Sequence, residues 1–273
     1  MTQRHPARLH VLLAREAKVG VVLRRGPSKS VCSVLWNRRT DEFKAAQWLR
    51  GRIYERRSDI SADGRFLIYF AMNGRWGSAT QGSWTAVSKV PWLKAIVLLS
   101  KGDCWHGGGL FTSEREYWLN DGYGHRVMKD IAMPRRDYNY RPKGNYGGEC
   151  LGVYFVRLQR DGWVLKPSVS EMDLTIFEKP LSHGWILRKY AHAQTGAPPG
   201  KGCYWDEHEL EHSASGNRMD GAKWEWADCD GKMLVWAEGG CLFRATVKAS
   251  GLGDQKLLKD FNEMKFEALP APY

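Results

Sequence analysis

Two histidines in the last quarter of the chain are spaced as zinc ligands often are. Residues 208–212 read His-Glu-Leu-Glu-His, and on a helix the two imidazoles would lie one turn apart on one face. There they could bind Zn²⁺ while Glu209 polarises a water molecule. No histidine follows His212, so a third ligand would be a carboxylate such as Glu225 or Asp228. A zinc hydrolase using His208, Glu209 and His212 is therefore one hypothesis.

The residues around this motif favour a strand instead. Ser213–Gly216 would stop any helix directly after His212, and glutamates crowd the motif. With a period of two, His208, Leu210 and His212 share one face while the glutamates share the other. We therefore predict a strand without a bound metal.

A run of glycines forms a second candidate for chemistry. His106-Gly107-Gly108-Gly109 is similar to the loops whose backbone amides stabilise an oxyanion in esterases. Such an enzyme also needs a Gly-x-Ser-x-Gly turn that carries the nucleophile, and the chain has none. A glycine-rich turn between strands explains the same residues, and we predict that structure here.

The third candidate is a loop in which cations alternate with aromatic rings. Guanidinium groups can bind phosphates or carboxylates, while phenol rings stack on bases or pack against a partner's side chains. A solvated loop with a few tyrosines packed on the rim is the alternative. The predicted ligand-binding residues are Arg135, Arg136, Tyr138, Tyr140, Arg141, Lys143 and Tyr146.

Positive charge is concentrated near the amino terminus. Residues 1–57 hold 14 Lys/Arg against 4 Asp/Glu, whereas residues 201–273 hold 9 against 13. Three arginine doublets, Arg24-Arg25, Arg38-Arg39 and Arg56-Arg57, lie in the basic part. This asymmetry makes nucleic-acid binding an alternative function. Neighbouring residues on a strand point to opposite faces, so each doublet would add only one charge per face.

The elements that must position these residues are mostly strands. The 13 Trp, 11 Tyr and 29 Gly suit pleated surfaces joined by tight turns. One helix is expected over Gln255–Phe266, capped by Asp254, because Leu257, Leu258, Phe261 and Met264 follow a helical spacing. Strands are predicted at Leu9–Ala14, Val19–Arg24, Val31–Trp36, Phe66–Met72, Ala95–Leu99, Gly152–Leu158, Leu174–Glu178, Trp185–Tyr190, Leu234–Ala237 and Leu242–Val247.

Short patterns recur along the chain. Ser61–Tyr69 matches Asp228–Trp236 in its Asp-Gly turn, the following cation and the apolar strand, and Trp105–Phe111 echoes Trp236–Phe243 in its glycine turn. The order of strand, Asp-Gly-Arg/Lys, strand, Gly-Gly and strand resembles the blade repeat of WD40-like and TolB-like β-propellers. The chain also resembles a bacterial propeller-like family in Ser58–Gly64 and Trp226–Gly231. These resemblances imply a propeller fold and no particular activity.

We therefore expect an all-β protein, a small β-propeller of about five blades forming one domain over residues 1–273. A long loop insertion is expected at about 121–148 and a carboxy-terminal helix at about 254–266. Loops of that length are uncommon without a role. The loop is thus the first place to look for a binding site.

The cysteines and the apolar runs indicate the cellular location in which the protein acts. The six cysteines lack paired C-x-x-C spacing, which indicates reduced thiols. No apolar run is long enough for a membrane span, and no signal peptide is recognised, so a cytoplasmic location is expected. No cofactor is predicted, because no phosphate-binding glycine loop is found. The favoured function is non-enzymatic binding or scaffolding with a macromolecular partner, which we expect to be a protein.

Overall fold

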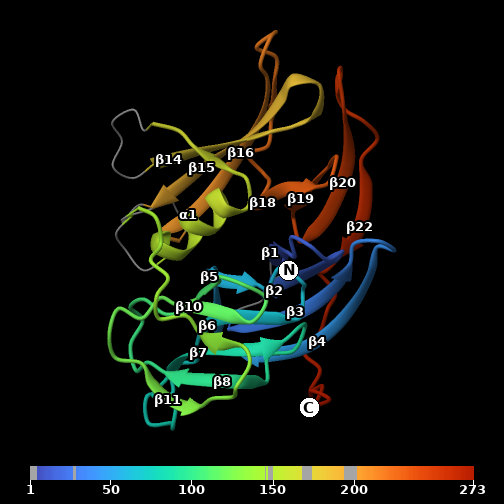
Figure 1. Cartoon of the computed structure of the whole chain (residues 1–273). Coiled ribbons are helices and arrows are strands. Elements are labelled where there is room, and N and C mark those ends of the chain that lie inside the picture. The colour runs from blue at the N-terminus through green and yellow to red at the C-terminus, as the bar shows by residue number, and fades with distance from the viewer. Residues whose placement is uncertain (1–4, 27–28, 145, 147–149, 168–173, 194–201) are drawn as a thin grey trace. The chain divides into compact units, whose positions relative to one another are not determined.

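The computed structural model describes residues 5–26, 29–144, 146, 150–167, 174–193 and 202–273 (Figure 1). The chain divides into two compact units. Unit 1 comprises Met1–His5, His10–Arg157 and Met264–Tyr273, and unit 2 comprises Pro6–Leu9 and Leu158–Glu263.

The fold is all-β, as the composition indicates. Strands make up 51% of the described residues, which contain several antiparallel sheets and one α-helix. Nine of the ten predicted strands lie where the apolar runs place them. No helix in the described ranges is long and apolar enough to cross a membrane. All six cysteines carry free thiols.

Unit 1 is built from three sheets whose strands mostly follow one another in chain order. The first has the order β1 (Arg8–Leu13), β2 (Val19–Arg25), β3 (Ser30–Asn37) and β4 (Glu42–Arg50). The second has the order β11 (Arg126–Lys129), β8 (Ala95–Ser100), β7 (Ser83–Lys89), β6 (Phe66–Met72) and β5 (Arg52–Ile60). The third has the order β12 (Arg135–Arg136), β10 (Glu116–Leu119) and β9 (Gly109–Phe111).

The predicted Asp-Gly turn joins β5 to β6. Ser61 Oγ accepts the backbone N–H groups of Arg65 and Phe66 at 3.1 and 2.9 Å and donates to Asp63 Oδ1 at 2.6 Å. Gly64 supplies the positive φ of 74° that the turn requires. Behind the turn, Leu67 is buried in the core that β1, β2, β6 and β7 share.

Unit 2 contains two further sheets. One has the order β13 (Val164–Leu165), β14 (Leu174–Pro180), β15 (Trp185–Ala193), β16 (Tyr204–His212) and β17 (Arg218–Asp220), with the 3-10 turn η1 (Ser182–Gly184) between β14 and β15. The other has the order β18 (Trp226–Asp230), β19 (Met233–Glu238), β20 (Cys241–Lys248) and β21 (Gly251–Leu252), and β22 (Lys256–Asp260) pairs with β20.

Aromatic side chains form much of the core of unit 2. Trp236 is almost fully buried, stacks on Phe243 at 5.6 Å between ring centroids, and contacts Trp224 at 5.2 Å. The second predicted Asp-Gly hairpin lies directly before it, where β18 and β19 pair Asp230 with Met233. The repeated turn thus has the same role in both units, which is to join two antiparallel strands.

The strand predicted at Gly152–Leu158 is wrong, because these residues belong to α1 (Leu151–Arg160). The helix begins where the Cys150 carbonyl accepts the Tyr154 N–H at 2.9 Å. Val153 through Leu158 are all buried, including the one charged residue Arg157, so the sequence pattern could not distinguish a strand from a helix here. The helix ends at Asp161-Gly162, where the Trp163 N–H donates back to the Leu158 carbonyl at 2.9 Å.

The carboxy-terminal helix predicted at 254–266 is also wrong. Lys256–Asp260 forms β22, which pairs with the edge of β20 in register Cys241↔Asp260 and Arg244↔Lys256. Leu257 is exposed while Phe261 is fully buried, so the apolar residues do not share one buried helical face. The open edge of β20 supplies backbone hydrogen bonds that outweigh local helical propensity.

Candidate binding surface

The predicted ligand-binding residues divide into an outer and an inner group. Arg135 pairs with Glu116 at 2.8 Å, and the Arg136 guanidinium lies over the exposed Tyr138 ring at 4.6 Å. Arg141 donates to the Tyr138 and Tyr140 carbonyls, and Lys143 is exposed.

Tyr140 and Tyr146 point inward instead. The Tyr140 ring contacts Trp118 at 6.0 Å, and Tyr146 packs edge-on against Phe155 at 5.4 Å. Of the long loop, Asn145 and Gly147–Glu149 lie outside the described residues. The structure therefore brings Arg135, Arg136 and Tyr138 together and uses the two inner tyrosines for packing.

The same segment carries exposed apolar side chains that sequence reasoning missed. Six of the eleven exposed large hydrophobic residues of the described chain fall between residues 123 and 138. A clue in the sequence was an apolar series, Val-Met at 127–128, Ile131 and Met133, in an otherwise polar loop. We name this set the β11 surface: Tyr123 (91% exposed), Val127 (61%), Met128 (37%), Ile131 (38%), Met133 (38%) and Tyr138 (69%).

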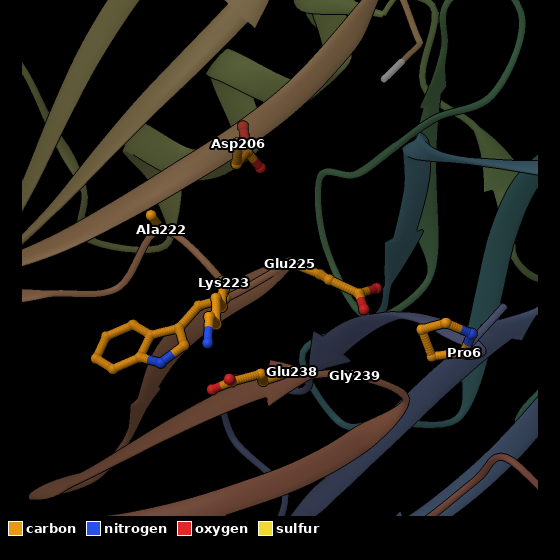
Figure 2. Close-up of a pocket in the computed structure, with 8 residues that line it drawn as sticks. Pro6, Asp206, Ala222, Lys223, Glu225, Glu238 and Gly239 are labelled. Atoms are coloured by element: carbon orange, nitrogen blue, oxygen red, sulfur yellow. The ribbon is translucent and has the colours of Figure 1, made fainter. Parts of the chain in front are cut away.

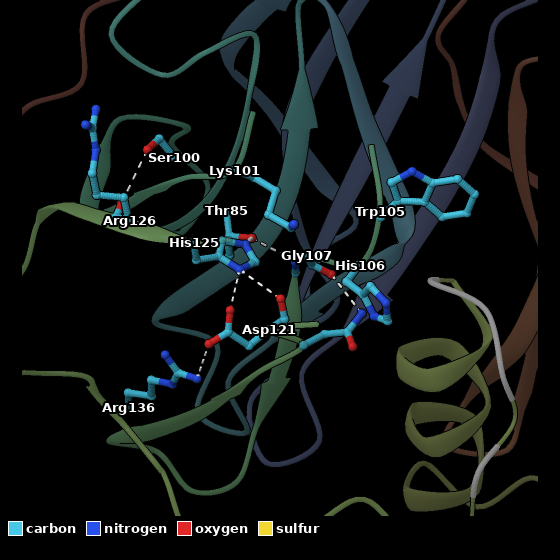
Figure 3. Close-up of polar contacts among 12 residues, drawn as sticks. Thr85, Ser100, Lys101, Trp105, His106, Gly107, Asp121, His125, Arg126 and Arg136 are labelled. Atoms are coloured by element: carbon cyan, nitrogen blue, oxygen red, sulfur yellow. Dashed lines mark hydrogen bonds and ion pairs between the residues drawn. The ribbon is translucent and has the colours of Figure 1, made fainter. Parts of the chain in front are cut away.

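A chain of hydrogen-bonded polar groups anchors both ends of this segment (Figure 3). Thr85 Oγ1 on β7 lies 3.0 Å from His125 Nε2, and His125 Nδ1 lies 2.8 Å from Asp121 Oδ1. Arg136 donates to the other oxygen of Asp121 at 2.7 Å. The Asp121–Arg136 pair thus closes residues 121–136 into one loop, and His125 ties that loop to β7.

The protonation state of the cluster follows from its surroundings. Burial lowers the pKa of His125 below its ordinary 6.5; the bond to Asp121 opposes this, and Lys101 adds to the lowering. Burial acts to raise the pKa of Asp121, but hydrogen bonds from Arg136 and His125 bring it below its ordinary value. At neutral pH a neutral His125 therefore donates from Nδ1 to the Asp121 carboxylate and accepts the Thr85 hydroxyl proton at Nε2.

A hydroxyl, an imidazole and a carboxylate in this order match a nucleophilic triad. Here, however, the hydroxyl is buried and hydrogen-bonded within the protein. Thr85 is fully buried, and its Oγ1 accepts the Gly108 N–H at 2.8 Å. Gly107 N–H donates to the Asn120 carbonyl at 2.8 Å. The Gly107 and Gly108 amides, which an oxyanion loop would present to a substrate, thus donate to groups within the protein. The glycine run forms a turn before β9, as predicted.

The zinc-like motif lies on β16, which confirms the strand interpretation. His208 is buried, with Nδ1 2.9 Å from the Trp224 carbonyl and Nε2 2.8 Å from Lys189 Nζ. His212 instead contacts Ser215 Oγ at 2.9 Å.

Four residues of strand separate the Cα atoms of His208 and His212 by roughly 13 Å, too far for the one-turn spacing that the motif needs. The helical geometry on which the zinc-hydrolase hypothesis depends is therefore absent at His208 and His212. Within the described ranges, no group of three or more His, Cys, Asp or Glu side chains is arranged to hold a metal ion.

The basic doublets contribute less surface charge than their sequence indicates. Arg24 is buried over Trp48 while Arg25 is partly exposed, as alternation predicts. Arg56 and Arg57 are both buried, because the register of β5 shifts between Tyr54 and Asp59 and breaks the alternation. Three of the 14 Lys/Arg of residues 1–57 are therefore buried in the described structure.

A hollow of about 360 Å³ is present in unit 2 (Figure 2). Two of the three carboxylates that line it already have partners within the protein. Glu225 accepts the Leu9 N–H at 3.1 Å, and Asp206 lies 3.7 Å from the buried Lys189 ammonium. The hollow is lined by Pro6, Asp206, Ala222, Lys223, Trp224, Glu225, Glu238 and Gly239.

No protein-family model matches the chain, and its sequence matches no curated protein.

Acidification is expected to destabilise unit 1 through His125. Below pH 6.5 the unfolded chain binds a proton at this residue that the folded chain does not, so stability rises with pH in this window and falls as pH decreases. The unfolding free energy of the wild-type chain should therefore decrease as the pH is lowered below 6.5, and that of a His125→Gln variant should decrease less. Urea denaturation at four pH values, compared with His125→Gln, measures this contribution. Parallel pH dependences in the two proteins would contradict it.

Proposed function

We propose that this chain is a non-enzymatic binding protein that recognises a protein partner through the β11 surface. The concentration of exposed apolar side chains in one loop carries the proposal. Several exposed apolar residues within one short segment are typical of protein interaction sites.

The residue types around these apolar side chains support a protein partner. Residues 121–143 contain six Lys/Arg and three Asp, so apolar anchors and cations occur together. Methionine, tyrosine and arginine are enriched in the cores of protein interfaces. Anchoring by His125, Asp121 and Arg136 holds the loop in place before binding, which reduces the entropy lost on association.

We further infer that the sheets are blades of a small, WD40-like propeller with about five blades, acting in the cytoplasm. The supporting observation is that the described residues form five sheets, in which chain neighbours mostly pair antiparallel, with recurring Asp-Gly turns. Loops gathered at one face of a propeller form recognition surfaces. An experimental structure in which the first and last sheets lie apart would refute the closed arrangement.

Site-specific photo-cross-linking tests the binding function. A benzophenone amino acid at Val127 is expected to capture one partner from extracts of the native host, and unlabelled wild-type chain should compete for it. The matched control places the same amino acid at Leu257, which is exposed by 51% but lies on β22. Equal capture at both positions would overturn the proposal.

The captured protein is then purified and its Kd for the full chain measured. Replacing Val127→Asp together with Ile131→Asp should weaken binding by at least about tenfold, because both apolar contacts are lost. Leu257→Asp should leave Kd within about twofold. An unchanged Kd in the double variant would also overturn the proposal.

A further inference from the structure

β11 forms the outer edge of the second sheet of unit 1, beside β8 (Figure 1). It pairs with β8 in register Arg126↔Ser100 and Val127↔Leu99, and in the part of the chain that is described no strand pairs with its other side. An edge strand directs part of its backbone N–H and C=O groups outward, where another strand can bind them. All four of its side chains are exposed.

The charges of β11 disfavour a second copy of this chain as the occupant. In antiparallel self-pairing centred between Val127 and Met128, Arg126 of one copy would lie opposite Lys129 of the other. Like charges directly opposite one another destabilise a strand pair.

The same charges favour an acidic partner. Acidic side chains opposite Arg126 and Lys129 would form cross-strand pairs, and apolar side chains opposite Val127 and Met128 would cover exposed apolar area. Main-chain hydrogen bonds then supply affinity while the side chains select the sequence.

From this geometry we infer that β11 accepts an added strand from the partner whose central four residues read acidic, apolar, apolar, acidic. The inference rests on the proposed function, because it assigns the partner's chemistry at that surface.

Peptide titration followed by nuclear magnetic resonance of the labelled full chain tests the inference. The probe is the capped peptide Thr-Glu-Val-Val-Glu-Thr, and its control is Thr-Lys-Val-Val-Lys-Thr. The glutamate peptide should shift the backbone amides of Arg126–Lys129 and bind at least about tenfold more tightly than the lysine peptide. Methylating both valine nitrogens should weaken binding by a similar factor, because one of these N–H groups must face β11.

Charge reversal on the protein provides the matched test. The exposed double variant Arg126→Glu with Lys129→Glu should prefer the lysine peptide. Equal binding of both peptides, full binding of the methylated peptide, or no shift at millimolar peptide would each overturn strand addition. These outcomes leave the cross-linking result at Val127 unaffected, so failure of this inference and failure of the binding function are distinguishable.

Discussion

Gly108→Ala is expected to lower the unfolding free energy by about 3–5 kcal/mol. Gly108 has a φ of +72°, which L-residues with a Cβ adopt at a cost. A Cβ there would lie 1.8 Å from the Arg57 carbonyl oxygen, so backbone must move. The same movement would disturb the Gly108 N–H bond to Thr85 Oγ1 and with it the anchor of the β11 surface. Chemical denaturation of the purified chain measures the loss.

Gly239→Ala is the matched control, because the sequence around Gly239 resembles that of the glycine turn that contains Gly108. Gly239 has a φ of +58°, but an added Cβ meets nothing within 4 Å. Gly239→Ala should lower the unfolding free energy by about 1 kcal/mol, because only the backbone conformation disfavours alanine there. If Gly108→Ala yields no soluble protein while Gly239→Ala does, the order of effects still holds. Equal destabilisation of the two variants would contradict the contact argument.

Arg57→Met should also lower the unfolding free energy by about 3–5 kcal/mol. Arg57 is only 2% exposed, and its guanidinium donates to the Cys104 and His106 carbonyls and to Cys150 Sγ. It also lies 4.7 Å from the Tyr54 ring centre. Methionine fills a similar volume but leaves buried carbonyl groups without these donors, and unsatisfied buried acceptors are costly.

Arg39→Met provides the comparison for Arg57→Met. Both arginines are the second member of a doublet, yet Arg39 is exposed at the turn between β3 and β4. Removing its charge should change stability by less than about 0.5 kcal/mol. Thermal and urea denaturation of both variants give the two values. A similar loss for both would show that Arg57 contributes no more than a surface charge.

Gly108 and Arg57 both lie in the region that positions the β11 surface. Gly108 donates to Thr85, which hydrogen-bonds His125, and Arg57 donates to the carbonyl of His106 in the same glycine turn. Variants here are expected to change the loop that presents the binding side chains as well as overall stability. Binding measurements should therefore use the exposed variants at Val127 and Ile131, whose side chains lie outside this packing.

The sequence by itself determined the strand content and several turns. Apolar runs such as Phe66–Met72 and Leu234–Ala237 became strands because their periods and lengths leave few other ways to bury them. The Asp-Gly turns were equally legible, because glycine tolerates the positive φ that such turns need. For the same local reason, alternation along residues 208–212 correctly predicted β16.

Tertiary structure decided what depends on distant partners. Lys256–Asp260 is a strand because β20 offers an open edge, and Gly152–Leu158 is helical although its apolar run also suits a strand. Thr85 and His125 are 40 residues apart in sequence and meet only through the pairing of β7, β8 and β11. Likewise, a register shift in β5 buried both members of one arginine doublet. Local patterns carry periodicity and turn chemistry, whereas edges, bulges and long-range hydrogen bonds exist only once the sheets have formed.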